Sequence, residues 1–264
     1  MAFELAVEAV AGTGPVRTRV IVLHGIFGRG RNWRSLCRRV TQARPDIEFL
    51  LADLRMHGDS RAAPPPHTLA TAAADVSRLA EKSATEVILG HSFGGKVALA
   101  LLSDAPPPSV RQAWIIDASP GRRQAGSRQV DEVMAALDAL PETFPDRAAV
   151  LAALAERNLP PAIAGWLAQG FIRAADGTFH GFDRAALRAL LADHDAADLW
   201  SVVKAPPCEV RFVLGGRSDT VGPADRARLE DLGVTVDVIA GAGHWVHVDA
   251  PDEMVALLSE ALIQ

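Results

Sequence analysis

Gly-His-Ser-Phe-Gly, residues 90–94, is the stretch that decides the fold of this chain. It follows the short apolar run Val87–Leu89 and precedes a helical pattern over residues 96–102. A serine between a strand and a helix in this arrangement lies on a sharp turn, and the flanking glycines let the backbone pass closely without a Cβ clash. The turn exposes the serine oxygen at the end of a sheet. The pattern therefore predicts a reactive Ser92.

A serine hydroxyl is a weak nucleophile at neutral pH and needs a base. We expect His244 to be that base, since it follows a β-like run over residues 234–239 and lies on the loop Gly-Ala-Gly-His-Trp, residues 241–245. His247 is the alternative, and we favour His244 because it lies nearer the end of the strand. We expect three other histidines to brace loops instead of moving protons: His24, His57 and His91.

Two further stretches support a resemblance to a known family. His-Gly-Ile-Phe-Gly, residues 24–28, follows an apolar run at 20–23, and Asp-Leu-Arg-Met-His-Gly-Asp-Ser spans residues 53–60. Together with the serine turn and the late histidine, they resemble the α/β-hydrolase family over nearly the whole chain. Within it, the chain is most similar to a branch of small bacterial and organellar carboxylesterases.

The resemblance implies a Ser-His-Asp hydrolase with Ser92 as nucleophile and His244 as base. It implies an oxyanion hole made by the backbone amides of Ile26 and Phe93, where a helix N-terminus adds partial positive charge. A serine nucleophile argues against dehalogenase and epoxide hydrolase activity, because those members of the family carry aspartate there.

Two aspartates compete for the role of the acid that orients the histidine. Asp219 follows the apolar run at residues 212–214 and occupies the position that the family uses most often. Asp117 follows the preceding strand-like run at residues 113–116, where the carboxylesterase branch has its acid. Both lie at strand ends on the same edge, so the residues alone leave the choice open. We lean toward Asp117 on the branch resemblance.

Composition agrees with a globular enzyme. The 264 residues are 49% hydrophobic, enough for one α/β domain with an inserted cap. A net charge of −5 gives no electrostatic argument for nucleic acid or an anionic membrane as partner. We find no apolar run of ~18 residues and no signal peptide, and two distant cysteines suggest reduced thiols, so we expect a cytoplasmic protein. No ligand cluster with metal spacing appears, and we expect neither metal nor cofactor.

Alternating strand and helix patterns predict a doubly wound, mostly parallel sheet. We expect strands over residues 3–10, 19–23, 47–52, 87–89, 113–116, 210–214 and 234–239, and helices over 32–40, 69–81 and from Pro251. Thr68 is the expected N-cap of the second helix.

Residues 121–207 contain helical patterns but no convincing strand. About 85 residues are too many for a simple crossover, so we expect a helical cap over the sheet edge where α/β proteins bind ligands. Residues 1–120 and 208–264 then form the core. Trp166, Phe171 and Trp245 are our candidate substrate-binding residues; other aromatic residues that either line the cap or fill its core are Phe144, Phe179, Phe182 and Trp200.

The expected function is hydrolysis of small-molecule carboxylic esters through an acyl-enzyme, by a monomer or homodimer. The same residues would serve a carbon–carbon bond hydrolase, a lactonase, a cofactor-free perhydrolase or a slow small-molecule receptor, because fold alone does not separate these functions.

Overall fold

The computed structural model describes residues 3–104, 106–123, 128–157 and 159–263, so residues 1, 2, 105, 124–127, 158 and 264 of the predicted core and cap lie outside the described residues. A seven-stranded sheet forms its centre, in the order β1-β3-β2-β4-β5-β9-β10. Six strands run parallel, and β1 pairs antiparallel with β3 at one edge. The strands are β1 (Val7–Ala11), β2 (Thr18–Leu23), β3 (Ile47–Ala52), β4 (Val87–His91), β5 (Gln112–Ile116), β9 (Glu209–Gly215) and β10 (Thr235–Ile239).

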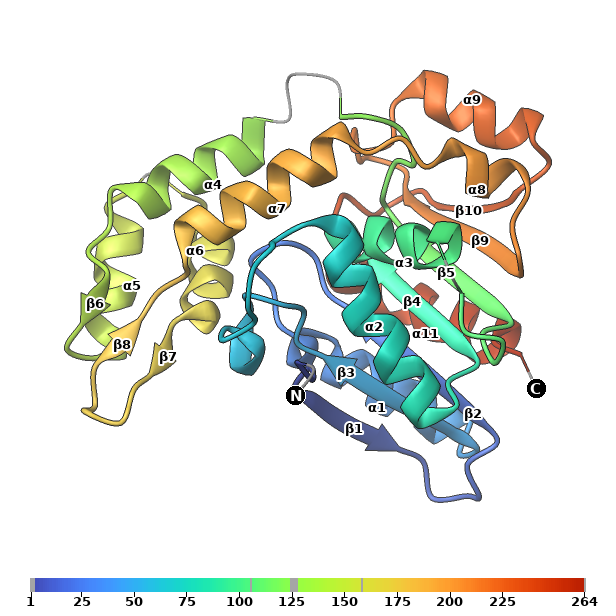
Figure 1. The fold of residues 1–264 in the computed structure, drawn as a ribbon, viewed down its shortest axis with the longest axis horizontal. Helices are drawn as coiled ribbons and strands as arrows, with labels where there is room; N and C mark the ends of the chain where they lie inside the picture. Colours follow the sequence, from blue (N-terminus) through green and yellow to red (C-terminus); the bar gives the residue numbers. More distant parts are fainter. Residues whose placement is uncertain (1–2, 105, 124–127, 158, 264) are drawn as a thin grey trace.

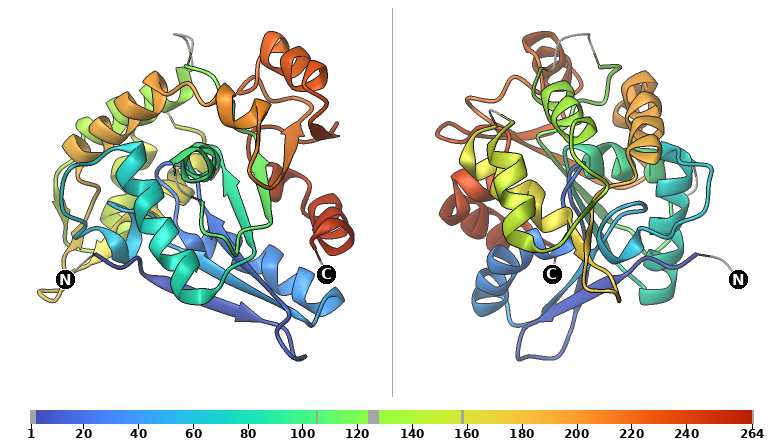
Figure 2. Two further views of the ribbon diagram at one scale, coloured as in Figure 1. Left: turned by 45° about the vertical axis from the view of Figure 1, so that its right-hand side comes forward. Right: turned by 90° about the vertical axis from the view of Figure 1, so that its left-hand side faces the viewer.

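Helices cover both faces of the sheet (Figures 1 and 2). One apolar cluster joins the side chains of one sheet face to α2 (Leu69–Ser83), α3 (Phe93–Asp104) and α8 (Trp200–Lys204). A second cluster joins the other face to α1 (Arg34–Ala43) and α11 (Pro251–Ala261). Neighbouring residues of β4 alternate between the two clusters, with Ile88 in the first and Leu89 in the second. Burial on both faces explains why the central strands are apolar throughout.

The remaining core elements are short. The 3-10 helices η1 (Gly30–Trp33) and η2 (Gly58–Ser60) follow β2 and β3, while α9 (Pro223–Asp231) and α10 (Val246–Asp249) follow β9 and β10. Thr68 has an extended backbone, and its side chain accepts a hydrogen bond from the amide of Thr71, which confirms it as the N-cap of α2.

Between β5 and α8, the described residues form four α-helices and a small antiparallel sheet. The helices are α4 (Arg128–Asp138), α5 (Arg147–Ala155), α6 (Pro161–Leu167) and α7 (Arg184–Ala196), with η3 (Ala168–Gly170) after α6. The sheet has the order β6-β8-β7 and consists of β6 (Thr143–Phe144), β7 (Ile172–Arg173) and β8 (Phe179–His180). In Figures 1 and 2 this segment arches over one end of the central sheet.

Three expectations differ from the structure. The first strand is Val7–Ala11 and not residues 3–10. The segment after β5 contains strands, which we did not expect: each has only two residues, too few for an alternating pattern to be visible. It also contains α8, which the sequence did not reveal. No helix among the described residues has both the length and the apolar character needed to cross a membrane.

Candidate active site

Three predicted site residues lie beyond the ends of strands of the central sheet. Ser92 comes after β4 and Asp117 after β5, while His244 lies on the loop after β10. The amide of Ser92 donates to the carbonyl of Ile116 at 2.9 Å, which extends the pairing of β4 with β5 by one residue. This register brings Ser92 and Asp117 to the same edge of the sheet.

The three side chains form one continuous hydrogen-bonded chain. His244 Nε2 lies 3.1 Å from Ser92 Oγ, and His244 Nδ1 lies 2.7 Å from Asp117 Oδ2. With Nδ1 protonated and donating to the carboxylate, Nε2 presents its lone pair to the serine hydroxyl. This is the tautomer that a general base requires.

The turn at Ser92 is possible because the glycines around it allow close contacts. A Cβ at Gly90 would lie 2.2 Å from the carbonyl oxygen of Gly94, and a Cβ at Gly94 would lie 2.5 Å from that of Leu23. Helix α3 therefore begins directly against β2 and β4. Ser92 itself has φ 53°, a left-handed conformation that a residue with a side chain adopts only under strain.

Asp117, and not Asp219, reaches the histidine. Its side chain is fully buried, and besides His244 it accepts hydrogen bonds from the amide of Gly215 at 3.0 Å and from Ser218 Oγ at 2.5 Å. Asp219 is exposed, and its carboxylate makes no hydrogen bond within the described residues.

Two hydroxyl groups at this site did not emerge from the sequence. Ser218 Oγ donates to Asp117, and Thr220 Oγ1 lies 3.0 Å from His244 Nδ1. Both flank Asp219 on the loop after β9. The same loop carries Asp219, the alternative acid. The two hydroxyl residues beside Asp219 in the sequence are the signal that could have indicated these contacts.

The backbone amides predicted to form the oxyanion hole are free. Neither Ile26 nor Phe93 uses its amide in a hydrogen bond among the described residues. The amide of Phe27 points elsewhere, since it donates to His57 Nε2 at 3.2 Å. Phe27 has φ 65°, and this left-handed residue sets the course of the loop over residues 24–28.

His24 and His57 brace that loop reciprocally. His24 Nε2 accepts the amide of Leu54 at 3.0 Å, while His57 accepts the amide of Phe27. Each ring is thus held by an amide of the other loop, and the ring centroids lie 4.9 Å apart. Burial lowers the pKa of His24 and lowers that of His57 to about 3, so both rings are neutral and keep an acceptor nitrogen at physiological pH.

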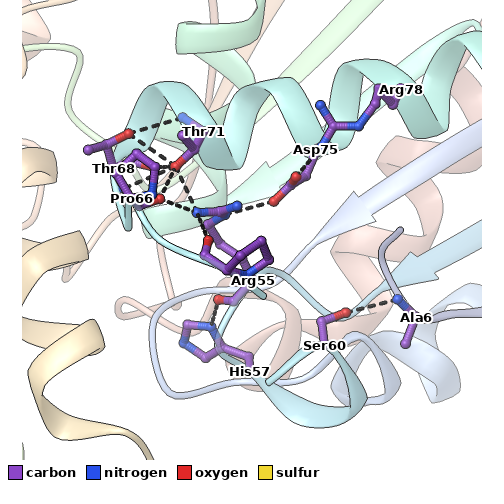
Figure 3. A network of polar contacts seen from close by, with 10 residues as sticks. Ala6, Arg55, His57, Ser60, Pro66, Thr68, Thr71, Asp75 and Arg78 are labelled. Carbon is purple, nitrogen blue, oxygen red and sulfur yellow. Dashed lines mark hydrogen bonds and ion pairs between the residues drawn. The ribbon is translucent and has the colours of Figure 1, made fainter. Parts of the chain in front are cut away.

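A buried ion pair holds the loop over residues 53–60, which contains His57 (Figure 3). Arg55 Nε donates to Asp75 Oδ2 of α2 at 2.7 Å, and both side chains are almost completely buried. Arg55 also contacts the carbonyl of Pro66, and its own carbonyl accepts from His57 Nδ1 at 2.8 Å. The last contact leaves His57 Nε2 unprotonated, as its role toward Phe27 requires.

His91 and His247 lie beside His244 without a hydrogen bond to Ser92. His91 Nε2 donates to the carbonyl of His244 at 2.8 Å and so holds its loop. His247 stacks on Trp33 with centroids 4.0 Å apart, and burial lowers its pKa to about 3. No hydrogen bond joins His247 to Ser92, which leaves His244 as the base that the geometry supports. The loop-bracing expected of His24, His57 and His91 agrees with these contacts.

A cavity of about 510 Å³ opens beside Ser92 and His244. Its walls come from the loop over residues 24–28, from η1, α4, α6 and η3, and from the loop into α10. The candidate substrate-binding residues Trp166 and Trp245 both line it, with ring centroids 5.7 Å apart. Phe171 does not: it is buried against Phe144 and Phe182, so we no longer assign it to substrate.

No group of three His, Cys, Asp or Glu side chains with metal-binding geometry occurs among the described residues.

The chain is similar to known hydrolases over most of its length. A family model described as "Alpha/beta hydrolase family" matches residues 20–257. The sn-1-specific diacylglycerol lipase ABHD11 of Mus musculus is 28% identical over 253 residues, 92% of this chain and 80% of that protein. Esterase YbfF of Escherichia coli is 28% identical over 247 residues, 92% of each chain.

A solved structure described as a marine microorganism esterase superposes with a TM-score of 0.81 at 22% identity, covering 97% of this chain and 98% of that chain. The solved structure of E-2-(acetamidomethylene)succinate hydrolase superposes with a TM-score of 0.75 at 22% identity, covering 97% of this chain and 98% of that chain. At this identity the two structures establish the fold.

Proposed function

The chain belongs to the alpha/beta hydrolase family, and from that premise we propose that it cleaves carboxylic esters of small molecules through an acyl-enzyme on Ser92. The protein is an esterase- and lipase-type hydrolytic enzyme, as its relatives are named. The observation that carries the finer proposal is the unbroken chain of contacts from Asp117 through His244 to Ser92, at 2.7 and 3.1 Å.

In the proposed reaction, His244 Nε2 accepts the proton of Ser92 as the serine oxygen attacks the ester carbonyl. The tetrahedral intermediate collapses when its bond to the alcohol oxygen breaks, and His244 returns the proton to the leaving alcohol. Water, deprotonated by the same nitrogen, then attacks the acyl-enzyme. The acid leaves and Ser92 regains its proton.

The amides of Ile26 and Phe93 stabilise the oxyanion in this scheme. Neither amide is hydrogen-bonded to another described residue, and the Phe93 amide is also the first of α3, where the helix dipole favours negative charge. One such donor is worth about 2.7–4 kcal/mol of transition-state stabilisation. Asp117 keeps the ring of His244 in the required tautomer and stabilises the imidazolium that forms.

The segment between β5 and β9 acts as a cap in this proposal. Its helices α4 and α6 contribute Val133 and Trp166 to the cavity walls, so it excludes water and shapes the acyl and alcohol pockets. A cavity of about 510 Å³ fits a small-molecule ester.

Labelling with a fluorophosphonate tests the proposal. We expect the probe to label Ser92 stoichiometrically and to abolish hydrolysis of p-nitrophenyl butyrate. Ser92→Ala removes both labelling and turnover, whereas substitution of Ser103, an exposed serine of the helix α3 that follows Ser92, by alanine (Ser103→Ala) changes neither. Labelling at another serine, or ester turnover by Ser92→Ala at the wild-type rate, would falsify the assignment.

A further inference from the structure

One pair of amide side chains stands out in the wall of the active-site cavity. Asn32 of η1 and Gln169 of η3 both line it, and Asn32 Nδ2 lies 2.9 Å from Gln169 Oε1. The two residues are 137 positions apart and join the core to the segment between β5 and β9. The proposed acyl transfer uses neither of them.

The backbone fixes the orientation of both amides. The amide nitrogen of Arg29 lies 2.7 Å from Asn32 Oδ1, and because a backbone N–H can only donate, this atom of Asn32 is an oxygen. The Nδ2 group of Asn32 must then donate to Gln169, so the contacting atom of Gln169 is its oxygen. The Nε2 group of Gln169 is left with its two N–H bonds directed away from the pair.

These N–H bonds have no acceptor among the described residues, and Gln169 is a half-buried residue of the cavity wall. The Nε2 atom of Gln169 is accessible from the cavity and is not one of the unpartnered polar atoms that the protein encloses. A polar donor at a largely apolar wall favours a ligand that supplies an acceptor.

The rest of the wall sets the charge and polarity of that ligand. Apolar side chains line the same cavity, among them Val133, Ile163 and Trp166. Among the described side chains that line the cavity none is a lysine, arginine, aspartate or glutamate. A charged substrate group would find no partner there and would lose its hydration.

We propose that Gln169, oriented by Asn32, is a specificity-determining residue that donates a hydrogen bond to a second oxygen of an uncharged ester substrate. The ligand class is an ester whose alcohol or acyl part carries an ether, hydroxyl or carbonyl oxygen besides the scissile group. The inference rests on the proposed ester hydrolysis, because it concerns the substrate of that same site.

Isosteric ester pairs test this assignment. 2-Methoxyethyl butyrate and n-butyl butyrate differ by one ether oxygen in the alcohol part, and ethyl 4-methoxybutanoate and ethyl hexanoate differ by one in the acyl part. We expect the wild-type kcat/KM to favour the ether member of one pair, by about three- to tenfold over the preference of alkaline hydrolysis, the ratio that one neutral hydrogen bond supports.

Two variants separate the donor from the shape of the side chain. Gln169→Glu keeps an oxygen for Asn32 but has no N–H, and Gln169→Leu has neither. Both are expected to lose the ether preference while still hydrolysing the hydrocarbon esters. An unchanged preference in both variants, or no preference in the wild type for either pair, overturns the inference and leaves ester hydrolysis intact. Absence of turnover of all four esters by wild-type protein overturns the proposed function, and the inference with it.

Discussion

Ser92 and Asp117 each have a left-handed backbone, with φ 53° and 45°, at the first position after neighbouring strands. Such a conformation costs about 1–3 kcal/mol for a residue with a side chain, and it persists because the surrounding structure determines it. Here the amides of both residues stay bonded to the adjacent strand, Ser92 to Ile116 and Asp117 to Val213. The two turns therefore present a hydroxyl and a carboxylate on the same edge, on either side of the His244 ring.

The acid is tested by comparing two carboxylates. We expect Asp117→Ala to lower kcat by about 10⁴-fold, because His244 loses the group that holds its tautomer and stabilises its charge. Asp219→Ala should have nearly wild-type kcat, since its exposed side chain contacts neither His244 nor Ser92. Steady-state kinetics on p-nitrophenyl butyrate measure both, with circular dichroism as the folding control. A large loss in Asp219→Ala together with a small one in Asp117→Ala would reverse the assignment.

The sequence pointed to Ser92 and His244 because the turn and the loop that hold them are local features. It left Asp117 and Asp219 open, since both follow strands that end at the same edge and only the packing decides which carboxylate faces inward. The Asn32–Gln169 pair had no signal in the sequence. Its two partners come from segments that only the folded chain brings together.

At the scale of elements, the predictions hold where a pattern is long. Strand β3 begins and ends at the predicted residues, and α2 begins after the predicted Thr68. The predicted start of β1 is four residues too early and its predicted end one residue too early, since the apolar residues that precede the strand also pack against the core. β6, β7 and β8 are two residues each, and their pairing depends on contacts that no local periodicity encodes.

The reciprocal contacts of His24 and His57 connect two loops, and this connection predicts an effect on catalysis. His57→Leu removes the acceptor for the amide of Phe27, next to the proposed donor Ile26. We expect kcat to fall by about 10–100-fold with KM little changed, since a displaced oxyanion donor affects the transition state more than the bound ester. Steady-state kinetics on a p-nitrophenyl ester separate the two parameters.

His57→Gln is the matched control, because its amide oxygen can take the place of the imidazole Nε2 as acceptor. It should recover most of the kcat that His57→Leu loses. Equal kcat in both variants would show that the contact does not position the oxyanion donors.

At the scale of the whole molecule, five of the eight histidines have pKa values lowered from the ordinary 6.5, each with burial as the largest cause. They are His24, His57, His91, His194 and His247. His24, His91 and His247 line the proposed active-site cavity. His24 and His57 hold the loops beside it by accepting backbone amides, which requires a neutral ring. The architecture that supports the site thus depends on rings that the folded protein keeps unprotonated.

This arrangement predicts a loss of stability in mild acid. An exposed histidine of the unfolded chain binds a proton below pH 6.5, whereas His57, with a pKa of about 3, stays neutral in the folded protein. The unfolded state then binds more protons, so the free energy of unfolding is greatest above pH 6.5 and falls as the pH drops toward 3. His57 alone accounts for about 2 kcal/mol between pH 7 and pH 5, and the other buried histidines act in the same direction.

Urea denaturation at pH 7, 6 and 5 measures this loss, with the free energy extrapolated to water at each pH. Gln has no proton to gain in this range. His57→Gln should therefore be less sensitive to acid than the wild type, by about 2 kcal/mol between pH 7 and pH 5, even where its stability at pH 7 is lower. An identical pH dependence in the two proteins would mean that His57 is protonated as readily in the folded as in the unfolded chain. The interpretation that His57 is neutral and accepts the amide of Phe27 would then be wrong, because a protonated ring has no acceptor nitrogen.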